Sequence, residues 1–270
     1  MGIELLKLVF FSPTGTTKKI IEGIARGIGY SSVAQFDITK PENRKRHIET
    51  SENELLIIGV PVYFGRVQTD AIEWLHTIKA HNTPAVCVVV YGNREYDDAL
   101  LELKETMVKR MCIPIACASF IGEHSFSSSE APIAAGRPDT DDLLKAESFG
   151  EKIRKKIVSI PSISLLTDVS VPGNYPYVDV TDNKKILHCL DFIAVDSSCT
   201  QCGVCAQHCP VGAIDFENSA SVDKTKCIVC HACIKKCPTK ARKVKNDMIR
   251  NFALRLSRKF QVRKEPAFFL

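Results

Sequence analysis

Short apolar runs alternate with amphipathic segments along residues 1–160 of the chain. The apolar runs begin at Leu5, Val33, Glu54, Pro84 and Cys112. Runs of this length, bounded by turn residues, are typical of buried β-strands. Five such strands separated by helices predict an α/β fold, in which helices cover both faces of a parallel sheet.

Apolar residues at helical spacing predict the helices between these strands. The first helix follows the run at Leu5, and its apolar positions are Ile20, Ile21, Ile24, Ala25 and Ile28. Three later helices are expected to begin near Thr69, Tyr96 and Asp139. Residues 39–53 are short and polar, so we expect a turn there in place of a full helix.

The loops at the carboxyl ends of the strands form the candidate site, because doubly wound sheets bind ligands there. The first loop, SPTGTT, places hydroxyls and a glycine at a helix N-terminus, where unpaired N–H groups favour a phosphate. Its candidate residues are Ser12, Thr14, Gly15, Thr16 and Thr17. An ordinary helix cap by Ser12 or Thr14 is the alternative. The loop lacks both G-x-x-x-x-G-K-[ST] and G-x-G-x-x-G, which argues against nucleotide triphosphate hydrolysis and a Rossmann site.

Two further loops carry aromatic residues beside a glycine. The candidate residues after the third strand are Pro61, Val62, Tyr63, Phe64 and Gly65, and those after the fourth are Tyr91, Gly92, Asn93 and Tyr96. Flat side chains at these positions would stack on a planar ring. With the phosphate loop they predict an FMN site, the phosphate in the first loop and the isoalloxazine between the other two. The alternative is that these aromatic residues only cap the core.

This region resembles the flavodoxins across about residues 4–160, since SPTGTT matches the family's phosphate-loop pattern. The resemblance implies a five-stranded parallel sheet with strand order 2-1-3-4-5. One departure is that common flavodoxins are acidic around the flavin, whereas Arg66 and Arg94 lie in the two ring loops. We expect an electropositive ring site from them, unless they face solvent or pair with Glu95, Asp97 or Asp98.

Two cysteine runs follow in the last third of the chain. CTQCGVCAQHCP and CIVCHACIKKCP share the spacing C-x2-C-x2-C-x3-C-P, and the second begins 28 residues after the first. Thiolates at this spacing, with a proline after the last cysteine, are typical of paired [4Fe–4S] clusters. A pair of zinc sites is the alternative, disfavoured because such sites usually take two cysteines per loop.

The cysteine runs resemble the bacterial-type two-cluster ferredoxins over roughly residues 190–242, a small α+β domain. The resemblance implies that one cluster is held by Cys199, Cys202, Cys205 and Cys237, and the other by Cys227, Cys230, Cys233 and Cys209. With cysteine at every ligand position, we expect His208 and His231 to be surface residues. The whole chain therefore looks like the flavodoxin–ferredoxin fusion proteins of anaerobic microbes, which implies electron transfer.

The remaining cysteines, the first residues and the lengths of the apolar runs indicate the setting of the protein. Of the twelve cysteines, Cys87, Cys112 and Cys117 are expected in the core, and the role of Cys189 stays open. The start, MGIELLKLVFF, is typical of a strand and not of a signal peptide. No run approaches the roughly 18 apolar residues of a membrane span. We therefore expect no membrane span and a cytoplasmic location, with oxygen-poor conditions plausible.

We divide the chain into an FMN-binding domain (1–160), a connector packed on it (161–189), the two-cluster domain (190–242) and a basic helix and tail (243–270). Residues 122–138 form a long loop that is expected to fold over the flavin or to seat the cluster domain. His124 within it is expected to be solvated or structurally bonded in preference to touching the ring.

Charge is concentrated at the end of the chain. Residues 235–270 hold 12 Lys and Arg against Asp247 and Glu265, in a chain with a net charge of +5. A helix is expected there, with its apolar stripe docked and its basic face either solvated or steering an acidic redox partner. Without a base-reading motif or aromatic interleaving, nucleic acid is not expected as a partner.

These features predict an electron-transfer protein that joins the one-electron steps of two [4Fe–4S] clusters to the two-electron steps of FMN. The alternative is an FMN-dependent reductase of a small molecule that uses the clusters as its electron inlet. The sequence offers no obvious proton donor, so we assign no catalytic residue. It leaves the redox partner, the direction of electron flow, the potentials and the oligomeric state open.

Overall fold

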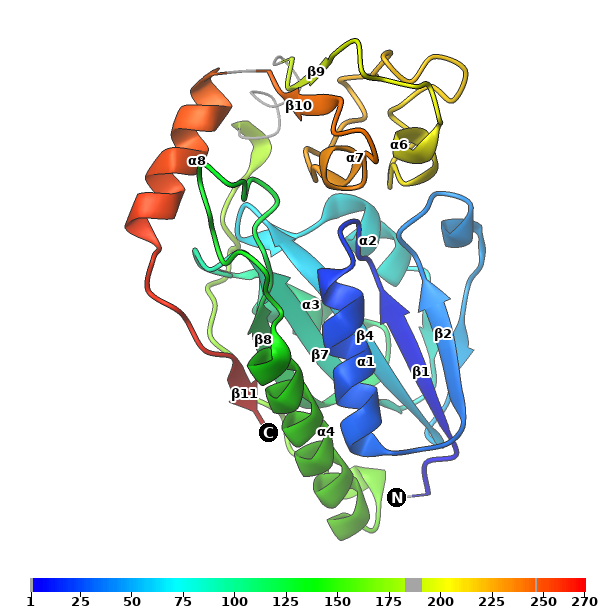
Figure 1. Cartoon of the computed structure of the whole chain (residues 1–270). Coiled ribbons are helices and arrows are strands. Elements are labelled where there is room, and N and C mark those ends of the chain that lie inside the picture. Colours follow the sequence, from blue (N-terminus) through cyan, green and yellow to red (C-terminus); the bar gives the residue numbers. More distant parts are fainter. Residues whose placement is uncertain (1, 183–190, 246) are drawn as a thin grey trace.

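The computed structural model describes residues 2–182, 191–245 and 247–270, so Cys189 lies outside the described residues. Five parallel strands form the centre of the molecule (Figure 1). Their order across the sheet is β2 (Val33–Asp37), β1 (Leu5–Phe10), β4 (Glu54–Tyr63), β7 (Thr83–Tyr91) and β8 (Cys112–Ile121). The predicted α/β class and the order 2-1-3-4-5 are confirmed.

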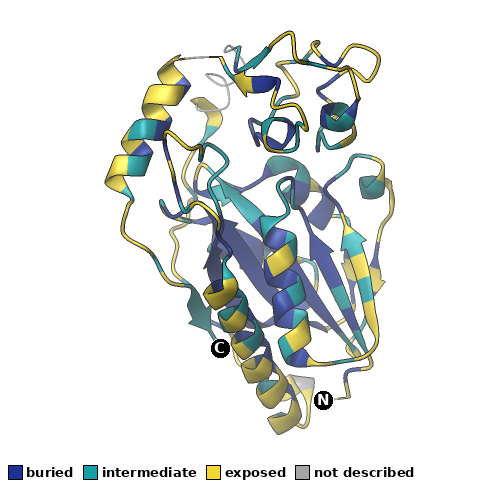
Figure 2. Cartoon of the chain, viewed as in Figure 1, coloured by how far each residue is buried: buried dark blue, intermediate teal, exposed yellow. Residues whose placement is uncertain are grey.

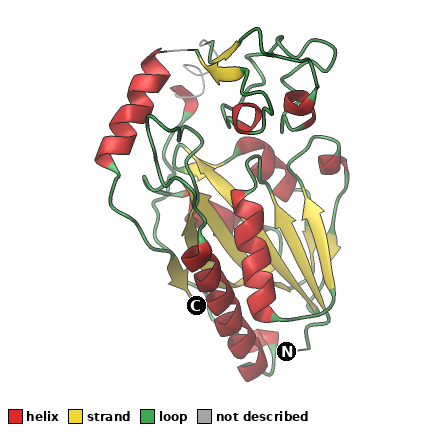
Figure 3. Ribbon diagram, in the orientation of Figure 1, coloured by secondary structure: helices red, strands yellow, loops and turns green. Residues whose placement is uncertain are grey.

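Helices cover both faces of the sheet, as Figure 3 shows. One face packs against α1 (Thr16–Ile28) and α4 (Thr140–Ser159), and the other packs against α2 (Thr69–Leu75) and α3 (Ala99–Lys109). The helices predicted near Thr69, Tyr96 and Asp139 are therefore present. The remaining short elements of this domain are η1 (Asn43–Lys45), β3 (Glu49–Thr50), β5 (Arg66–Val67), β6 (Lys79–Ala80) and η2 (Ile163–Leu165).

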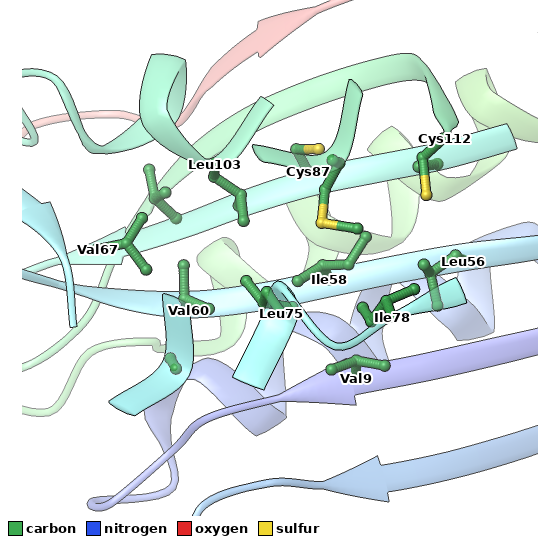
Figure 4. Packing of buried hydrophobic residues seen from close by; sticks show 14 of the residues in the cluster. Val9, Leu56, Ile58, Val60, Val67, Leu75, Ile78, Cys87, Leu103 and Cys112 are labelled. Atoms are coloured by element: carbon green, nitrogen blue, oxygen red, sulfur yellow. The ribbon is translucent and has the colours of Figure 1, made fainter. Parts of the chain in front are cut away.

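The central strands β4, β7 and β8 are largely buried, which is why they read as continuous apolar runs, whereas exposed and half-buried residues alternate along the edge strand β2 (Figure 2). On the α2 and α3 side, Val9, Ile58 and Leu103 pack in one cluster with Cys87 and Cys112 (Figure 4). Cys117 belongs to the same cluster. The prediction that these three cysteines are core residues is therefore confirmed.

An additional strand closes one edge of the sheet. β11 (Ala267–Phe269) pairs antiparallel with β8 at the very end of the chain. Phe268 stacks on Phe149 of α4, with ring centroids 4.7 Å apart, and lies 5.5 Å from the ring of Phe120. This strand was not predicted, because three residues are too few to show a periodic pattern. It fixes the tail to the domain where the chain begins.

The 28-residue sequence repeat is also a repeat of backbone conformation. α6 (Val204–Gln207) and α7 (Ala232–Lys235) are equivalent, and each follows a residue in the left-handed region, Gly203 and His231. Two further equivalent pairs have positive φ angles: Gln201 with Val229, and Gly212 with Lys240. β9 (Ile193–Val195) and β10 (Arg242–Val244) pair antiparallel and join the ends of this cysteine-rich domain. Such agreement indicates two loops built to hold the same kind of group.

The segment after α4 runs across the face of the sheet covered by α3. Val169 is buried in the core there, and Lys104 pairs with Asp168 at 2.7 Å. The carboxylate of Asp98 accepts hydrogen bonds from the backbone N–H groups of Asn174 (2.8 Å) and Val178 (2.7 Å). The described part of this segment therefore packs on the first domain. The cysteine-rich domain that follows it in the chain lies at the carboxyl ends of the strands.

The helix α8 (Asp247–Lys259) follows β10 and lies beside the loop 122–138 (Figure 1). Its buried residues are Ile249, Ala253 and Leu256. The hydroxyl of Ser257 donates to the carbonyl of Pro132, 2.8 Å away. The predicted apolar stripe is therefore docked, although Phe252 at the rim keeps 39% of its surface exposed.

The crossing of α1 and α4 depends on glycine. A Cβ on Gly150 would lie 2.2 Å from the carbonyl oxygen of Ile24, so the two backbones touch where no side chain fits. We expect Gly150→Ala to lower the free energy of unfolding by about 1–3 kcal/mol, because the helices must move apart. Urea unfolding measures this, with Gly2→Ala as control, since a Cβ there meets no atom within 4 Å. Equal stability of the two variants would contradict the close packing.

Candidate flavin and iron–sulfur sites

A cavity of about 990 Å³ opens at the carboxyl ends of β1, β4, β7 and β8. It lies where a doubly wound sheet binds its ligand. Nine of the fourteen residues predicted to bind FMN line it: Thr14, Thr16, Thr17, Pro61, Val62, Tyr63, Phe64, Tyr91 and Gly92. The three predicted loops therefore meet at one cavity.

Ser12, Gly15 and Gly65 do not line this cavity but shape its loops. The Ser12 hydroxyl accepts a hydrogen bond from the backbone N–H of Lys18 (3.0 Å), so the capping alternative holds for Ser12. Gly15 precedes α1 with a φ of 90° and supplies no side-chain cap. Gly65 has a φ of 82°, and a Cβ there would strike the side chain of Asp97. Each glycine permits a turn that a residue with a side chain would strain.

Asn93 and Tyr96 are also outside the cavity lining. The amide of Asn93 donates to the carbonyls of Phe260 (2.8 Å) and Val262 (2.9 Å) and accepts from the N–H of Lys264. Tyr96 packs against the core, with its ring 5.4 Å from that of Tyr91. The core-capping alternative thus holds for Tyr96, and Asn93 instead ties the C-terminal tail to the ring loop.

The phosphate loop has an unsatisfied hydroxyl. Thr17 is 1% exposed and lines the cavity, yet its Oγ1 has no hydrogen-bond partner among the described residues. The N–H groups of Thr16 and Thr17, in the first turn of α1, have no acceptor within the helix. A buried hydroxyl without a partner costs free energy unless a ligand supplies one. An anionic phosphate at this helix N-terminus fits both groups.

His124 lines the cavity as well. Its Nδ1 accepts a hydrogen bond from the N–H of Phe126 (3.0 Å), so the neutral ring carries its proton on Nε2. Burial, together with the nearby charges of Lys235 and Arg94, lowers the pKa of His124 to about 4. A Cβ on Gly92 would lie 2.3 Å from this ring, so Gly92 provides the space for it. His124 is structurally bonded, as expected, and also faces the site.

The two arginines of the ring loops are paired. Arg66 Nη2 lies 2.6 Å from the carboxylate of Glu102, which was not among its expected partners. Arg66 does not line the large cavity. Arg94 lines the cavity but pairs with Asp97, one of its expected partners. The expectation of an electropositive ring site is therefore not supported by Arg66, and at Arg94 the adjacent carboxylate offsets the charge.

Several residues of the cavity wall come from outside the first domain. They are Gly173, Asn174 and Val178 of the connecting segment, Ile228, Val229 and Cys230 of the second cysteine run, and Phe252, Arg255, Leu256, Lys259 and Phe260 at or just after α8. No local pattern could have identified them, because only the packing of the whole chain brings them here.

The second predicted cluster set surrounds a separate, smaller cavity. Cys209, Cys227, Cys230 and Cys233 all line it, together with apolar residues such as Ile214 and Val222. Cys209 comes from the first run, so the crossed arrangement expected from the ferredoxin resemblance brings these four residues together. The N–H of Ala213 donates to the Cys209 sulfur at 3.2 Å. Within the described residues, no three His, Cys, Asp or Glu side chains converge on a single metal ion.

The other predicted set is less enclosed. Cys202 is exposed, Cys199 and Cys237 are half-buried, and Cys205 is buried. Hydrogen bonds from the Thr239 hydroxyl and from backbone N–H groups lower the pKa of Cys237, although desolvation opposes them. Backbone N–H groups directed at sulfur favour the thiolate that an iron–sulfur cluster requires.

Arg242 connects the two cysteine sets. It is 3% exposed, and its Nη1 donates to the sulfur of Cys205 (3.4 Å) and to the carbonyl of Ser219 (2.5 Å). Its charge also acts on the thiols of Cys227 and Cys233. Nε and Nη2 are buried without a partner among the described residues. A buried cation with unpaired donors requires an anion beside it. An iron–sulfur cluster with thiolate ligands is such an anion.

His231 is buried, so its prediction as a surface residue was wrong. It is 4% exposed, and its Nδ1 lies 3.0 Å from the carbonyl of Ser125. Its ring packs on Phe126 at 4.8 Å, and Phe126 lies 5.2 Å from His124. The prediction failed because spacing cannot reveal that this loop faces the first domain. His208 remains half-buried.

Comparisons with known proteins agree with this division. A family model described as a flavodoxin domain matches residues 7–123, and one described as a 4Fe-4S dicluster domain matches residues 198–241. The chain joins a flavodoxin domain to a 4Fe-4S dicluster domain. The first implies a flavin and the second an iron–sulfur cluster, so the protein has an electron-transfer role.

Solved structures similar to the flavodoxin domain include the flavodoxin of Streptococcus pneumonia TIGR4, 17% identical, with 56% of this chain and 99% of that chain covered and a TM-score of 0.40. A Fusobacterium nucleatum flavodoxin bound to flavin mononucleotide is 12% identical, with coverage of 57% and 99% and a TM-score of 0.38. No curated protein matches the chain significantly. Among the helices of the described residues, none has both the length and the apolar character needed to span a bilayer.

Arg242 gives a test of the iron–sulfur site. We expect Arg242→Met to lower the midpoint potential of the bound iron–sulfur group by on the order of tens of millivolts, because a buried positive charge favours the reduced form. Arg242→Lys keeps the charge and should retain most of the potential. Redox titration followed by EPR measures both, with iron content as the control for loading. Equal potentials in Arg242→Met and the unmodified chain would show that the guanidinium faces no cluster.

Proposed function

We propose that this protein relays electrons between an FMN and two [4Fe–4S] clusters within one chain. The observation that carries the proposal is the position of Cys230, which lines both the four-cysteine cavity and the large cavity of the flavodoxin domain. A residue shared by both sites leaves little protein between the two cofactors. This close contact supports direct electron exchange between the flavin and the nearer cluster within the chain.

In this proposal the flavodoxin domain holds FMN through the residues of its three loops. Thr14, Thr16 and Thr17 bind the phosphate, and Tyr63, Phe64 and Tyr91 enclose the ring. Cys199, Cys202, Cys205 and Cys237 hold one cluster, and Cys209, Cys227, Cys230 and Cys233 hold the other. A flavin accepts two electrons and each cluster one, which is the chemistry that the cofactors supply. The protein contributes position, burial and the charge of Arg242.

A second candidate is a reductase that passes electrons from the flavin to a small molecule. It is favoured by the wall that α8 adds to the cavity, where Arg255 and Lys259 stand one helical turn apart. Two cations beside a flavin suit an anionic acceptor. The volume of about 990 Å³ is at the upper end of the range for ligand pockets. A relay that serves a separate redox protein is the form that we favour.

Anaerobic reconstitution of the full chain with iron, sulfide and FMN tests the relay. We expect about eight irons and one FMN per chain, followed by reduction of both cofactors in one reductive titration monitored by visible absorption and EPR. Zinc in place of iron, or a chain that takes up no flavin, would overturn the proposal. Turnover of an added acceptor without a partner protein would instead favour the reductase.

Thr17 tests the flavin site separately. We expect Thr17→Val to weaken FMN binding by about 10- to 100-fold, because a hydrogen bond to a charged group contributes about 1.5–3 kcal/mol. Thr83→Val is the matched control, since Thr83 is also buried with an unpaired hydroxyl among the described residues but does not line the cavity. Quenching of flavin fluorescence on binding measures both affinities. Equal losses in the two variants would place the phosphate elsewhere.

A further inference from the structure

The two cysteine sets differ in their distance from the flavodoxin domain. Cys230 lines the large cavity, and Cys227 lines an adjoining cavity of about 540 Å³ together with Tyr63 and Phe64. No cysteine of the other set is among the described residues that line either cavity. The set of Cys209, Cys227, Cys230 and Cys233 is therefore the one that faces the flavin site.

Direct packing holds this face in place. Ile228, between the two cysteines, packs against the core of the flavodoxin domain. Tyr63 and Ile228 both line the large cavity and the adjoining cavity that Cys227 also lines. The flavin cavity and the second cysteine run therefore share wall residues.

An aromatic contact gives a second connection between the sites. His231, next to Cys230, packs on Phe126, and Phe126 packs on His124 of the large cavity. Lys235 of α7 donates to the carbonyl of His124 (3.1 Å) and pairs with Glu123. The loop that follows β8 therefore seats the second cysteine run and lines the flavin site at once.

The set of Cys199, Cys202, Cys205 and Cys237 faces outward. Cys202 is exposed, and the ring of Phe216, 66% exposed, lies over the adjacent Gly203. The Gln201 side chain accepts from the N–H of Ser219 (2.9 Å), within the dicluster domain itself. Arg242, between the sets, links this outer set to the inner one.

We propose that the electron path is ordered. The cluster held by Cys209, Cys227, Cys230 and Cys233 lies next to the flavin. The other cluster, held by Cys199, Cys202, Cys205 and Cys237, exchanges electrons with a one-electron redox protein at the surface. This inference rests on the proposed relay. Two single electrons, delivered in turn at the outer set, amount to the electron pair that a flavin accepts, and water supplies the protons. The partner class is thus a one-electron carrier and not a hydride donor.

A matched pair of variants tests the order. Cys205 and Cys233 occupy equivalent positions in the repeat, are each 7% exposed, and are absent from the lining of the large cavity. Serine at either position keeps an oxygen ligand and should alter the EPR signal of one cluster, which assigns the two signals. We expect FMN addition to shift the signal assigned by Cys233→Ser and to leave the signal assigned by Cys205→Ser unchanged.

A soluble dysprosium chelate provides the complementary measurement, since it should speed the relaxation of the outer cluster alone. The reverse assignment in either measurement overturns the proposal. If the serine variants lose their clusters, the unmodified chain still tests the order. The EPR signal that responds to FMN and the EPR signal that responds to dysprosium must then be different signals. One signal that responds to both, or none that responds to FMN, overturns the order. A chain that binds no FMN, or far fewer than about eight irons, would instead refute the relay itself.

Discussion

The seating of the second cysteine run on the loop after β8 is the contact on which the arrangement of both sites depends. His231 is held by the carbonyl of Ser125 and by the ring of Phe126, both from the flavodoxin domain. Lys235, one turn along, pairs with Glu123. Because these partners belong to the start of the loop 122–138, which also lines the flavin cavity, that part of the loop cannot shift without moving both sites. A fixed separation is the condition that electron exchange between two buried groups requires.

The C-terminal residues reinforce this arrangement from the other side. β11 pairs with β8, and Asn93 of a ring loop holds the backbone of residues 260–264. Arg137, only 6% exposed, pairs with the buried Asp142 and also donates to the carbonyl of Lys264 (2.8 Å). With both the dicluster domain and the tail anchored, α8 is held beside the cavity, and its cations become part of the wall. The basic end of the chain thus has an internal role as well as an exposed surface.

Two buried polar groups without partners among the described residues lie beside the candidate cofactor sites. Thr17 in the phosphate loop and Arg242 between the cysteine sets have unpaired atoms among the described residues, and both lie where a negative group is expected. Leaving such groups unpaired costs free energy, and folded proteins usually avoid that cost. Each of the two groups would gain a partner from a bound anion: a phosphate at Thr17 and an iron–sulfur cluster at Arg242.

The sequence by itself determined the main helices and strands and the candidate chemistry. Continuous apolar runs alternating with helices predicted a buried parallel sheet, and SPTGTT marked a helix N-terminus. The 28-residue repeat of cysteines predicted two equivalent loops. Each of these signals is local in the chain. The tertiary structure alone decided which cysteine set faces the flavin cavity, that His231 is buried, that Asn93 holds the tail and that β11 completes the sheet. These depend on contacts between residues more than 100 positions apart, such as His231 with Ser125 and Asn93 with Phe260. Periodicity along the chain records which face of an element is apolar, but it does not record which distant surface will cover that face.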